Sequence, residues 1–550
     1  MMISIEGVGI FDDATESDAI FQACINQHGM YETMRFVLRL SPVNHALIEK
    51  LDDQPIQFAD LSPELVDAFS TYLHETVHWW QHVGSTSGLV LSLSYLAESH
   101  SNLDDLKEII ATLGCKKPLK GYTDQLLRRE GDAAQVKLAR ANTVVNNALD
   151  IEHYKLLALL PRERAEWLLQ QIHFEAAGHD YLITYAQVMG LIESVGGVGA
   201  SLFDKMETIE SSLQRMKSEK VEGFFHGSPI RLPAVGMKAI YEGQARFIQL
   251  QLSHAFLSAP PSLVSMKDDG SLFGIYLEAF EAFLRLTENE WPDSIDSPAV
   301  GLFLLICDLA INPTRGIPLK IESYEEFLRD VDAGSRFTMF CLAVKQMSHL
   351  KNAVVDYSRD EYVAIATELT KATGHDNPID GISAVINWLE KAPELQKLME
   401  EYQTFEYTSM NMPIRVFVSH FIAFYRDKLI HPEFFCWPGI YLTGQRPKDE
   451  AKDLWLRHLS LFSDRGDKAG VYPRKRPDRS DEATMSMFTQ FYGTMALYDL
   501  TRQWILRDGA FINDFRWLAE TYDQAGAEDW ANNSFRQVYG ALLSDFEIVQ

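Results

Sequence analysis

Apolar residues recur at helical spacing along most of the chain. From residue 62 onward they return every three or four positions, which is the period of an amphipathic helix. We therefore expect a predominantly α-helical protein. The predicted helices cover residues 63–83, 89–100, 103–113, 123–158, 161–171, 183–194, 201–219, 232–257, 272–288, 297–311, 336–354, 358–372, 381–402, 413–429, 482–507 and 512–523.

The start of the chain has a different pattern. Apolar and β-branched residues predict a strand near residues 3–10, a short helix over 18–28 and a second strand over 33–40. Residues 173–184 could form a small hairpin around Gly178. The expected fold class is thus helical with a small β-containing N-terminal part.

Turn-forming residues divide the chain into three predicted segments. Residues 1–60 would form the mixed N-terminal segment, 61–260 a helical core, and 261–550 a helical region suited to substrate or partner recognition. A further soft boundary lies near residue 375. The stretch 463–481 is predicted to be a long loop, and its basic run could dock on the protein's own acidic surface or on a partner, or lie in solvent.

The helix predicted over 63–83 contains the motif HETVH at residues 74–78. His74 and His78 are one helical turn apart, so both imidazoles can reach one ion. Glu75 lies about 100° further round the helix and can meet a water on that ion. This spacing is typical of zinc hydrolases, with two histidine ligands and a glutamate base.

The local sequence favours this helix. Ser62 can cap it, Pro63 suits its first position, and Gly84 can end it. Apolar residues follow one face of the helix, namely Val66, Phe69, Leu73, Val77 and Trp80.

A catalytic zinc site needs a third protein ligand and an open fourth position. The residue six positions after His78 is Gly84, which excludes the HExxHxxGxxH pattern. We expect a glutamate from a later helix instead. Glu242 is the first candidate, because its small neighbours would permit close helix packing, and Glu193 is the alternative.

Other polar residues could support the site. His82 continues the histidine stripe and is predicted to lie behind the ligands or on the surface. A further donor would stabilise the negative oxygen that forms in the transition state. The sequence does not rank the candidates for that role, which are Tyr241, His153, Tyr154, His420 and Tyr425.

HETVHWWQ followed by STSGL, and later G-x-x-x-I-x-E-G-x-A-R, resembles the glutamate-zincin (gluzincin) class of metallopeptidases. The resemblance implies that His74, His78 and Glu242 bind Zn²⁺ and that Glu75 is the general base. It also implies a zincin-like metallopeptidase core over residues 61–260, with a large helical region after it. The residues that carry the resemblance lie only around these two motifs. Thermolysin-like members have an aspartate where this chain has Arg246, so another residue must orient a ligand histidine, with Asp308 or Asp150 as candidates.

Composition limits the partners and the compartment. The 550-residue chain is 46% hydrophobic and has a net charge of −27, which argues against nucleic-acid binding and against anionic membranes. The five scattered cysteines predict reduced thiols. We expect a cytoplasmic protein with no membrane span, a protein or peptide substrate and room for a regulatory protein partner.

The expected function is that of a zinc metallopeptidase with a specific intracellular protein substrate. Two alternatives remain open. One is a non-catalytic helical interaction protein with a structural metal or a decayed protease core. The other is a di-iron carboxylate oxidoreductase, because Glu75 and His78 form an ExxH pattern and Asp150 to His153 (DIEH) a weaker second one.

Overall fold

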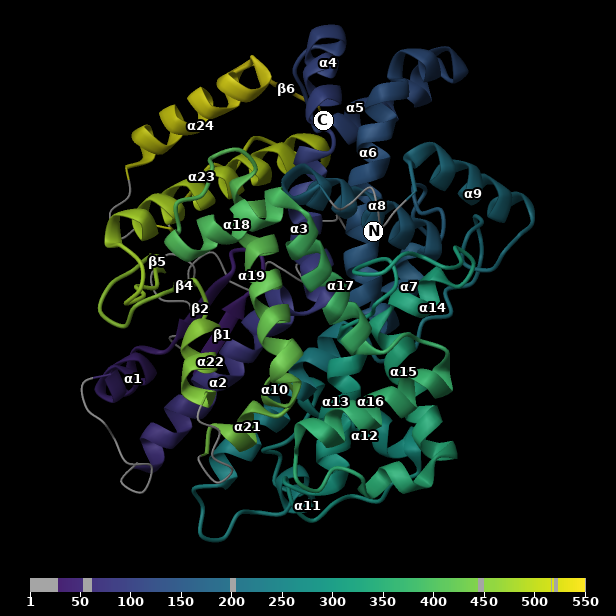
Figure 1. Cartoon of the computed structure of the whole chain (residues 1–550). Helices are drawn as coiled ribbons and strands as arrows, with labels where there is room; N and C mark the ends of the chain where they lie inside the picture. Colours follow the sequence, from purple (N-terminus) through teal and green to yellow (C-terminus); the bar gives the residue numbers. More distant parts are fainter. Residues whose placement is uncertain are drawn as a thin grey trace.

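The computed structural model of the chain describes residues 28–52, 62–197, 204–443, 450–515, 517–518 and 523–549. This part is predominantly helical, as the hydrophobic pattern predicts (Figure 1). The longer helices are α1 (Pro42–Asp52), α2 (Pro63–Gly84), α3 (Thr86–His100), α4 (Leu103–Leu113), α5 (Leu119–Glu130), α6 (Asp132–Leu159), α7 (Pro161–Leu168), α8 (Ala177–Gly196), α9 (Met206–Ser218), α10 (Met237–His254), α12 (Ile275–Thr287), α13 (Pro298–Ile311), α15 (Ala333–Gln346), α16 (Arg359–Thr373), α17 (Pro378–Lys391), α18 (Pro393–Thr404), α19 (Met412–Ile430), α23 (Asp481–Leu506) and α24 (Gln524–Tyr539).

The remaining elements are short. The helices of this group are α11 (Leu263–Asp268), α14 (Phe327–Val331), α20 (Pro432–Cys436), α21 (Pro438–Tyr441), α22 (Ala451–Arg457) and the 3₁₀ turns η4 (Ser348–Asn352) and η5 (Leu543–Asp545). The strands are β1 (Gly29–Glu32), β2 (Val37–Leu40), β3 (Lys116–Lys117), β4 (Phe462–Ser463), β5 (Tyr472–Pro473) and β6 (Glu547–Ile548).

Helix α2 runs through the middle of the fold. Ser62 caps it by accepting a hydrogen bond from the Leu65 N–H, and Pro63 is its first residue, as predicted. Every residue from Tyr72 to Gly84 is buried, so the motif lies inside the protein rather than on an exposed face. Helices α10, α3, α1 and α19 pack around it.

A single residue joins α2 to α3. The Ser85 hydroxyl donates to the Gln81 carbonyl at 2.6 Å and accepts from the Gly88 N–H at 3.0 Å. A Cβ at Gly88 would lie 1.8 Å from the same carbonyl oxygen, so only glycine permits this approach. The connection thereby fixes the end of α2 that carries Gln81.

A four-stranded sheet in the order β1-β2-β4-β5 lies beside α2 (Figure 1). Strand β1 pairs antiparallel with β2, which pairs in parallel with β4. Among the strands of the described residues, β1 is therefore at the edge of the sheet, and it lies directly on α2. The predicted strand over 33–40 is confirmed only for β2, because residues 33–36 form a turn that ends at Phe36 with a φ of 57°.

Several predicted boundaries are wrong. The helix expected over 123–158 is divided at Gly131, where φ is 58°, and that expected over 381–402 is divided before Pro393. No helix occupies residues 512–515, and α24 has no counterpart in the prediction. The strand predicted near residues 3–10 and most of the helix predicted over 18–28 lie outside the described residues.

The hairpin predicted around Gly178 is also wrong, because α8 begins at Ala177. Gly178 lies in its first turn, where its N–H donates to the Gly223 carbonyl at 2.8 Å. A Cβ there would lie 2.7 Å from the Phe224 ring. The glycine permits close packing rather than a turn.

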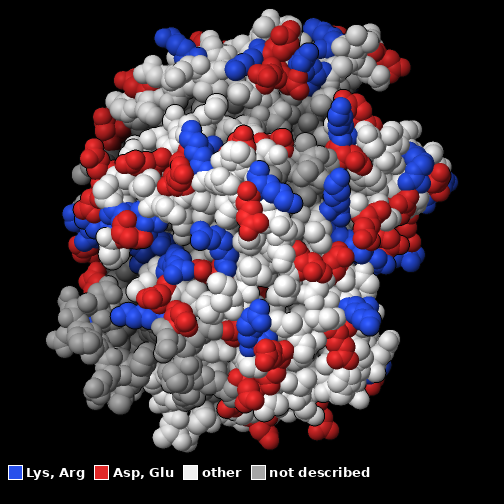
Figure 2. Space-filling model, in the orientation of Figure 1, with Lys and Arg blue, Asp and Glu red and all other residues white. Residues whose placement is uncertain are grey.

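One hydrophobic cluster extends from Tyr31 to Tyr492 and draws on all three segments predicted from the sequence. The division of the chain at residues 60 and 260 therefore stays a prediction. Within the described ranges, no helix combines the length and the apolar character that crossing a membrane requires. Acidic and basic side chains are interspersed over the face shown in Figure 2.

The basic run in the predicted loop over 463–481 docks on the protein itself. Arg474 donates to the Ser460 carbonyl at 3.0 Å, and Arg476 donates to the carbonyls of Arg457 and Leu459 at 2.7 and 2.9 Å. Lys475 between them is largely exposed. The run thus contributes to the fold through backbone carbonyls, not through an acidic surface.

Candidate metal centre

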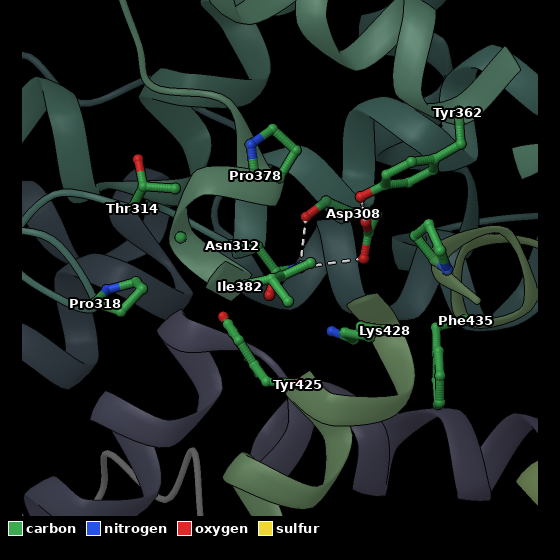
Figure 3. A pocket seen from close by; sticks show the side chains of 12 residues that line it. Asp308, Asn312, Thr314, Pro318, Tyr362, Pro378, Ile382, Tyr425, Lys428 and Phe435 are labelled. Carbon is green, nitrogen blue, oxygen red and sulfur yellow. Dashed lines mark hydrogen bonds between the residues drawn. The ribbon is translucent and has the colours of Figure 1, made fainter. Parts of the chain in front are cut away.

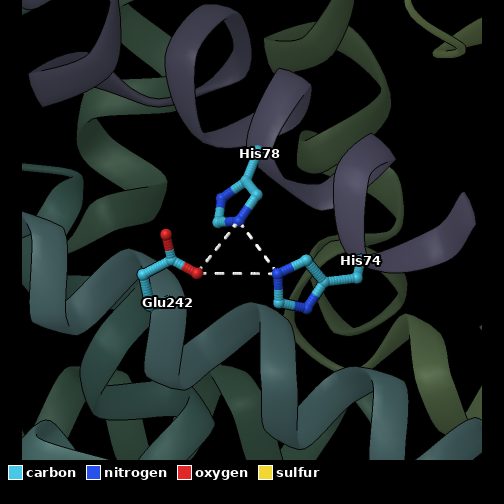
Figure 4. Close-up of side chains that lie close together, drawn as sticks. All are labelled: His74, His78 and Glu242. Atoms are coloured by element: carbon cyan, nitrogen blue, oxygen red, sulfur yellow. Dashed lines mark hydrogen bonds and ion pairs between the residues drawn. The ribbon is translucent and has the colours of Figure 1, made fainter. Parts of the chain in front are cut away.

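Helices α2 and α10 bring His74, His78 and Glu242 together (Figure 4). The Nε2 atoms of the two histidines are 3.1 Å apart. The Glu242 Oε2 atom lies 3.6 Å from His74 Nε2 and 3.4 Å from His78 Nε2. All three side chains point into the space between the two helices.

This triangle has the dimensions of one face of a tetrahedral zinc site. Zinc bonds nitrogen and oxygen ligands at about 2.0–2.1 Å, which places the ligand atoms of a tetrahedron about 3.3 Å apart. The three observed separations of 3.1, 3.4 and 3.6 Å scatter around that value. The donor set and its geometry therefore fit Zn²⁺ without rearrangement of the helices.

Gln81, one turn beyond His78, determines which nitrogen of His78 faces the site. The Gln81 side-chain N–H groups donate to the Tyr241 carbonyl at 3.0 Å and to Gln244 Oε1 at 2.9 Å. Its Oε1 must therefore accept from His78 Nδ1, 2.8 Å away. In neutral His78 the proton then resides on Nδ1, which leaves the Nε2 lone pair for a metal.

Gln81 is the last residue of HETVHWWQ, but the sequence predicts no role for it. The two aspartates predicted to orient a ligand histidine lie elsewhere. Asp308 accepts from Tyr362 at 2.8 Å and from Asn312, in a different pocket (Figure 3). Asp150 lies 3.4 Å from His179 on α8.

The metal-free site holds a proton where the ion would lie. Burial alone would lower the pKa of His78, but the Glu242 carboxylate raises it to about 9. Burial lowers the pKa of His74, so His74 is neutral and accepts from His78. Against the effect of burial, the two imidazoles hold the pKa of Glu242 well below its usual value. The pocket is therefore prepared for positive charge.

Glu75 is buried beside the triangle, under the edge strand. Burial raises the pKa of Glu75 to about 8, and the nearby Glu242 carboxylate acts in the same direction. The Tyr31 backbone N–H donates to its carboxylate. A Cβ at Gly29 would lie 3.0 Å from Glu75 Oε1, so glycine leaves room for the carboxylate.

A small pocket of about 80 Å³ opens onto the centre. Its lining residues are Tyr31, Thr33, His78, His82, Leu159, Lys238, Tyr241 and Glu242. His82, predicted behind the ligands or on the surface, is buried and stacks on Tyr31 with ring centroids 5.4 Å apart. Burial lowers the pKa of His82 to about 3, so this histidine is neutral at the pocket wall.

Tyr276 on α12 is a site residue that the sequence analysis missed. Its ring lies 5.9 Å from the His74 ring, centroid to centroid. Burial raises its pKa, and the carboxylates of Glu242 and Glu75 add to the increase because both lie near the phenol. In the sequence, Tyr276 is an isolated tyrosine at the start of a helix, and no motif marks it. Only the packing of α12 against the site brings it close to α2.

Gly243 lies where α10 packs on α12, the helix that carries Tyr276. Gly243 is one of the small neighbours of Glu242 that were expected to let their helix approach α2, but it faces α12 instead. A Cβ on it would lie 3.4 Å from Ala279 Cβ and 3.7 Å from the Tyr276 carbonyl oxygen. The predicted start of this helix at residue 232 is also wrong, since α10 begins at Met237.

The remaining predicted site residues lie away from the centre. Glu193 is exposed near the end of α8 and is not in the cluster with the two histidines. The other candidate donors are buried in separate surroundings, where His153 faces Asp180, Tyr154 packs on Tyr181, His420 packs on Tyr402 and Tyr425 bonds Thr86. Of the five candidates, Tyr241 lines the pocket, although its hydroxyl is 3.4 Å from the Gln81 carbonyl.

Comparison of the chain with protein-family models found no match, and comparisons with curated proteins and with solved structures also found none.

Proposed function

We propose that this protein is a zinc-dependent peptidase of the glutamate-zincin type. The observation that carries the proposal is the triangle formed by His74, His78 and Glu242, with separations of 3.1–3.6 Å and a buried Glu75 beside it. A structural zinc site is closed by four protein ligands, whereas these three ligands adjoin a pocket. A structural site would also have no use for Glu75.

Each residue of the centre has a separate role in the proposed reaction. His74, His78 and Glu242 hold the ion, and Gln81 keeps His78 in the metal-binding tautomer. Bound zinc supplies Lewis-acid chemistry, lowering the pKa of a water and polarising a carbonyl group. The raised pKa of Glu75 would fall beside the positive charge of a bound cation, and its carboxylate then accepts the proton of the attacking water and delivers it to the departing amine.

The position of strand β1 at the edge of the sheet, beside Glu75, favours a peptide as the substrate. The Ser41 N–H donates to the His28 carbonyl, so even-numbered residues of this strand direct their backbone groups toward β2. Gly29 and Tyr31 direct theirs to the opposite edge, on the side of Glu75. An extended peptide can add to such an edge through main-chain hydrogen bonds, provided that the Tyr31 N–H is released from Glu75. Its scissile bond would then pass over the metal centre.

Tyr276 is the proposed stabiliser of the transition state. Its phenol lies near both Glu75 and Glu242, and its raised pKa keeps it protonated and able to donate. A hydrogen bond to the negative oxygen stabilises the transition state more in such a partly buried site than it would in water. We assign this role to Tyr276 in preference to Tyr241, whose hydroxyl is directed to the Gln81 carbonyl.

Cleavage of a defined proteome tests the proposal. Wild-type protein loaded with zinc is incubated with cell lysate, and new peptide termini are identified by mass spectrometry. We expect new termini with the wild type and none with Glu75→Gln. Glu193→Gln serves as the matched control, because it removes an exposed carboxylate from another helix.

The proposal fails if zinc-loaded wild type yields the same termini as Glu75→Gln. In that case the interaction-protein alternative would gain support. The specificity we propose, a narrow set of intracellular proteins, would appear as few cleaved substrates in the lysate and little cleavage of a generic unfolded protein.

A further inference from the structure

A second cluster of metal-ligating side chains lies between α6 and α8, which pack along each other (Figure 1). Asp150 on α6 and His179 and Asp180 on α8 place one ligand atom each within 4.8 Å of the others. His153, one turn after Asp150, points its Nδ1 atom at Asp180 Oδ2 from 3.5 Å. From the sequence, Asp150 was a candidate to orient a ligand histidine, His153 a candidate transition-state donor, and the two together a weak ExxH match.

Protein contacts leave this cluster incompletely bonded. Asp150 pairs with His179 at 3.4 Å, but neither oxygen of Asp180 has a hydrogen-bond partner among the described residues. The His153 Nδ1 atom also has none. Asp180 is 0% exposed and His153 is 3% exposed, so water does not replace these partners freely. Buried polar groups without a hydrogen-bond partner are uncommon in folded proteins, and a bound ion is one way to satisfy them.

We propose that Asp150, His153, His179 and Asp180 form a second divalent-metal site, separate from the centre on α2. A cation would lie between the two carboxylates and use the Nδ1 atom of His153, which now faces Asp180 at 3.5 Å without a hydrogen bond. Two imidazoles with two carboxylates suit Zn²⁺, which takes up to four such ligands at about 2.0–2.2 Å. His153 contacts Asp180 but is not one of the three residues whose ligand atoms all lie within 4.8 Å of one another, so its side chain would have to move inward on binding. Zinc holds its ligand atoms about 3.3 Å apart, so the other three would also draw together.

The role of this site is structural. Four protein ligands leave no open position for a substrate. The ion would join α6 to the first turn of α8, at the place where Gly178 docks on the Gly223 carbonyl. The His179 side chain is 26% exposed and provides the route by which an ion enters.

Metal counting with matched variants tests the second site. We would load wild type, His179→Gln and His173→Gln with zinc, remove excess metal and measure zinc per chain by mass spectrometry. His173→Gln is the control, because its side chain is 25% exposed and also faces an aspartate, Asp124, at 3.2 Å. We expect about two zinc ions in the wild type and the control and about one in His179→Gln.

Thermal unfolding gives a second readout. Chelation should lower the Tm of wild type by more degrees than that of His179→Gln, because only the wild type has the second ion to lose. Asp180→Asn should behave like His179→Gln. If Asp180→Asn does not fold, His179→Gln still tests the proposal, because the His179 side chain is partly exposed. An unchanged zinc count and chelator response in His179→Gln would overturn the proposal.

The same measurement separates the two sites. His78→Ala should keep the zinc between α6 and α8 and lose the other. A single zinc that is lost in His78→Ala and kept in His179→Gln would overturn the second site and leave the peptidase proposal intact. The opposite result would support the second site and remove the zinc on which the peptidase proposal depends.

Discussion

At the scale of single residues, zinc binding at the candidate centre depends on the Gln81 side-chain amide, which fixes the orientation of His78. Gln81 contacts His78, the Tyr241 carbonyl and Gln244, and each of these contacts has only one possible hydrogen-bond direction. Residues that orient a ligand are part of a metal site even though they do not touch the ion.

Replacing Gln81 by leucine should weaken zinc binding at this centre by about 10- to 100-fold. The change keeps the approximate volume but removes the acceptor that fixes the His78 tautomer. Competition titration with a zinc chelator measures the loss. Gln244→Leu is the control on the neighbouring helix, and its effect should be smaller because Gln244 does not contact His78. Equal zinc affinity in Gln81→Leu and wild type would contradict this role.

Glu75→Gln should reduce kcat by about 10²- to 10⁴-fold and leave zinc content unchanged. The amide keeps the shape of the side chain but cannot accept a proton. Steady-state kinetics on an identified peptide substrate, together with zinc analysis, provide the check. Loss of zinc along with activity would instead make Glu75 a ligand or a structural residue.

Zinc affinity at the centre should rise with pH up to about 9. The Glu242 carboxylate raises the pKa of His78 to about 9 in the metal-free protein, so an ion must displace that proton at lower pH. The apparent association constant should increase by about tenfold per pH unit between pH 7 and 9. Calorimetric titrations in two buffers of different ionisation enthalpy would report the released proton. A pH-independent affinity would be inconsistent with this account.

The metal-free protein should show the opposite trend in stability. The pKa of His78 is raised from 6.5 to about 9, so its contribution is complete below pH 6.5 and is lost as pH rises through 9. Glu75 has a pKa raised from 4.5 to about 8, so its contribution is lost as pH rises through 8. The Tm of chelator-treated protein should therefore fall between pH 6.5 and 9. If the Tm of Glu75→Gln falls less over this pH range, the difference measures how much of the loss of stability comes from the Glu75 carboxyl group.

At the scale of elements, the sequence predicts the motif helix well and its surroundings poorly. The cap at Ser62, the end at Gly84 and the buried face of α2 follow from local propensity and periodicity, which act within one helix. The glutamate of α10 could be proposed because small residues flank it. Local pattern does not show that Gly243 faces α12 or that Tyr276 reaches the centre, since both depend on how three helices pack.

The turn between α2 and α3 provides a stability test. Gly88→Ala should destabilise the protein by about 3 kcal/mol, because its Cβ would lie 1.8 Å from the Gln81 carbonyl oxygen. Gly190→Ala in helix α8 is the control, since a Cβ there meets nothing within 4 Å. That change should stabilise by about 0.5–1 kcal/mol through helix propensity. Denaturant unfolding measures both, and equal stabilities would contradict the packing described for the turn.

At the scale of the whole molecule, a single hydrophobic cluster surrounds the candidate centre. Strand β2 pairs with β4, which is more than 400 residues away along the chain. Such long-range contacts leave no periodic signal in the sequence, which is why the edge strand beside Glu75 could not be predicted. The cluster between α6 and α8 was missed for the same reason, because its ligands come from two helices that meet only in the fold.

The central claim is that His74, His78 and Glu242 hold zinc beside Glu75. Anomalous diffraction at the zinc absorption edge, from crystals grown with zinc, tests it most directly. The account predicts a peak about 2.0–2.1 Å from His74 Nε2, His78 Nε2 and a Glu242 carboxylate oxygen. No peak among these three side chains at saturating zinc, in crystals where α2 and α10 are well ordered, would contradict it.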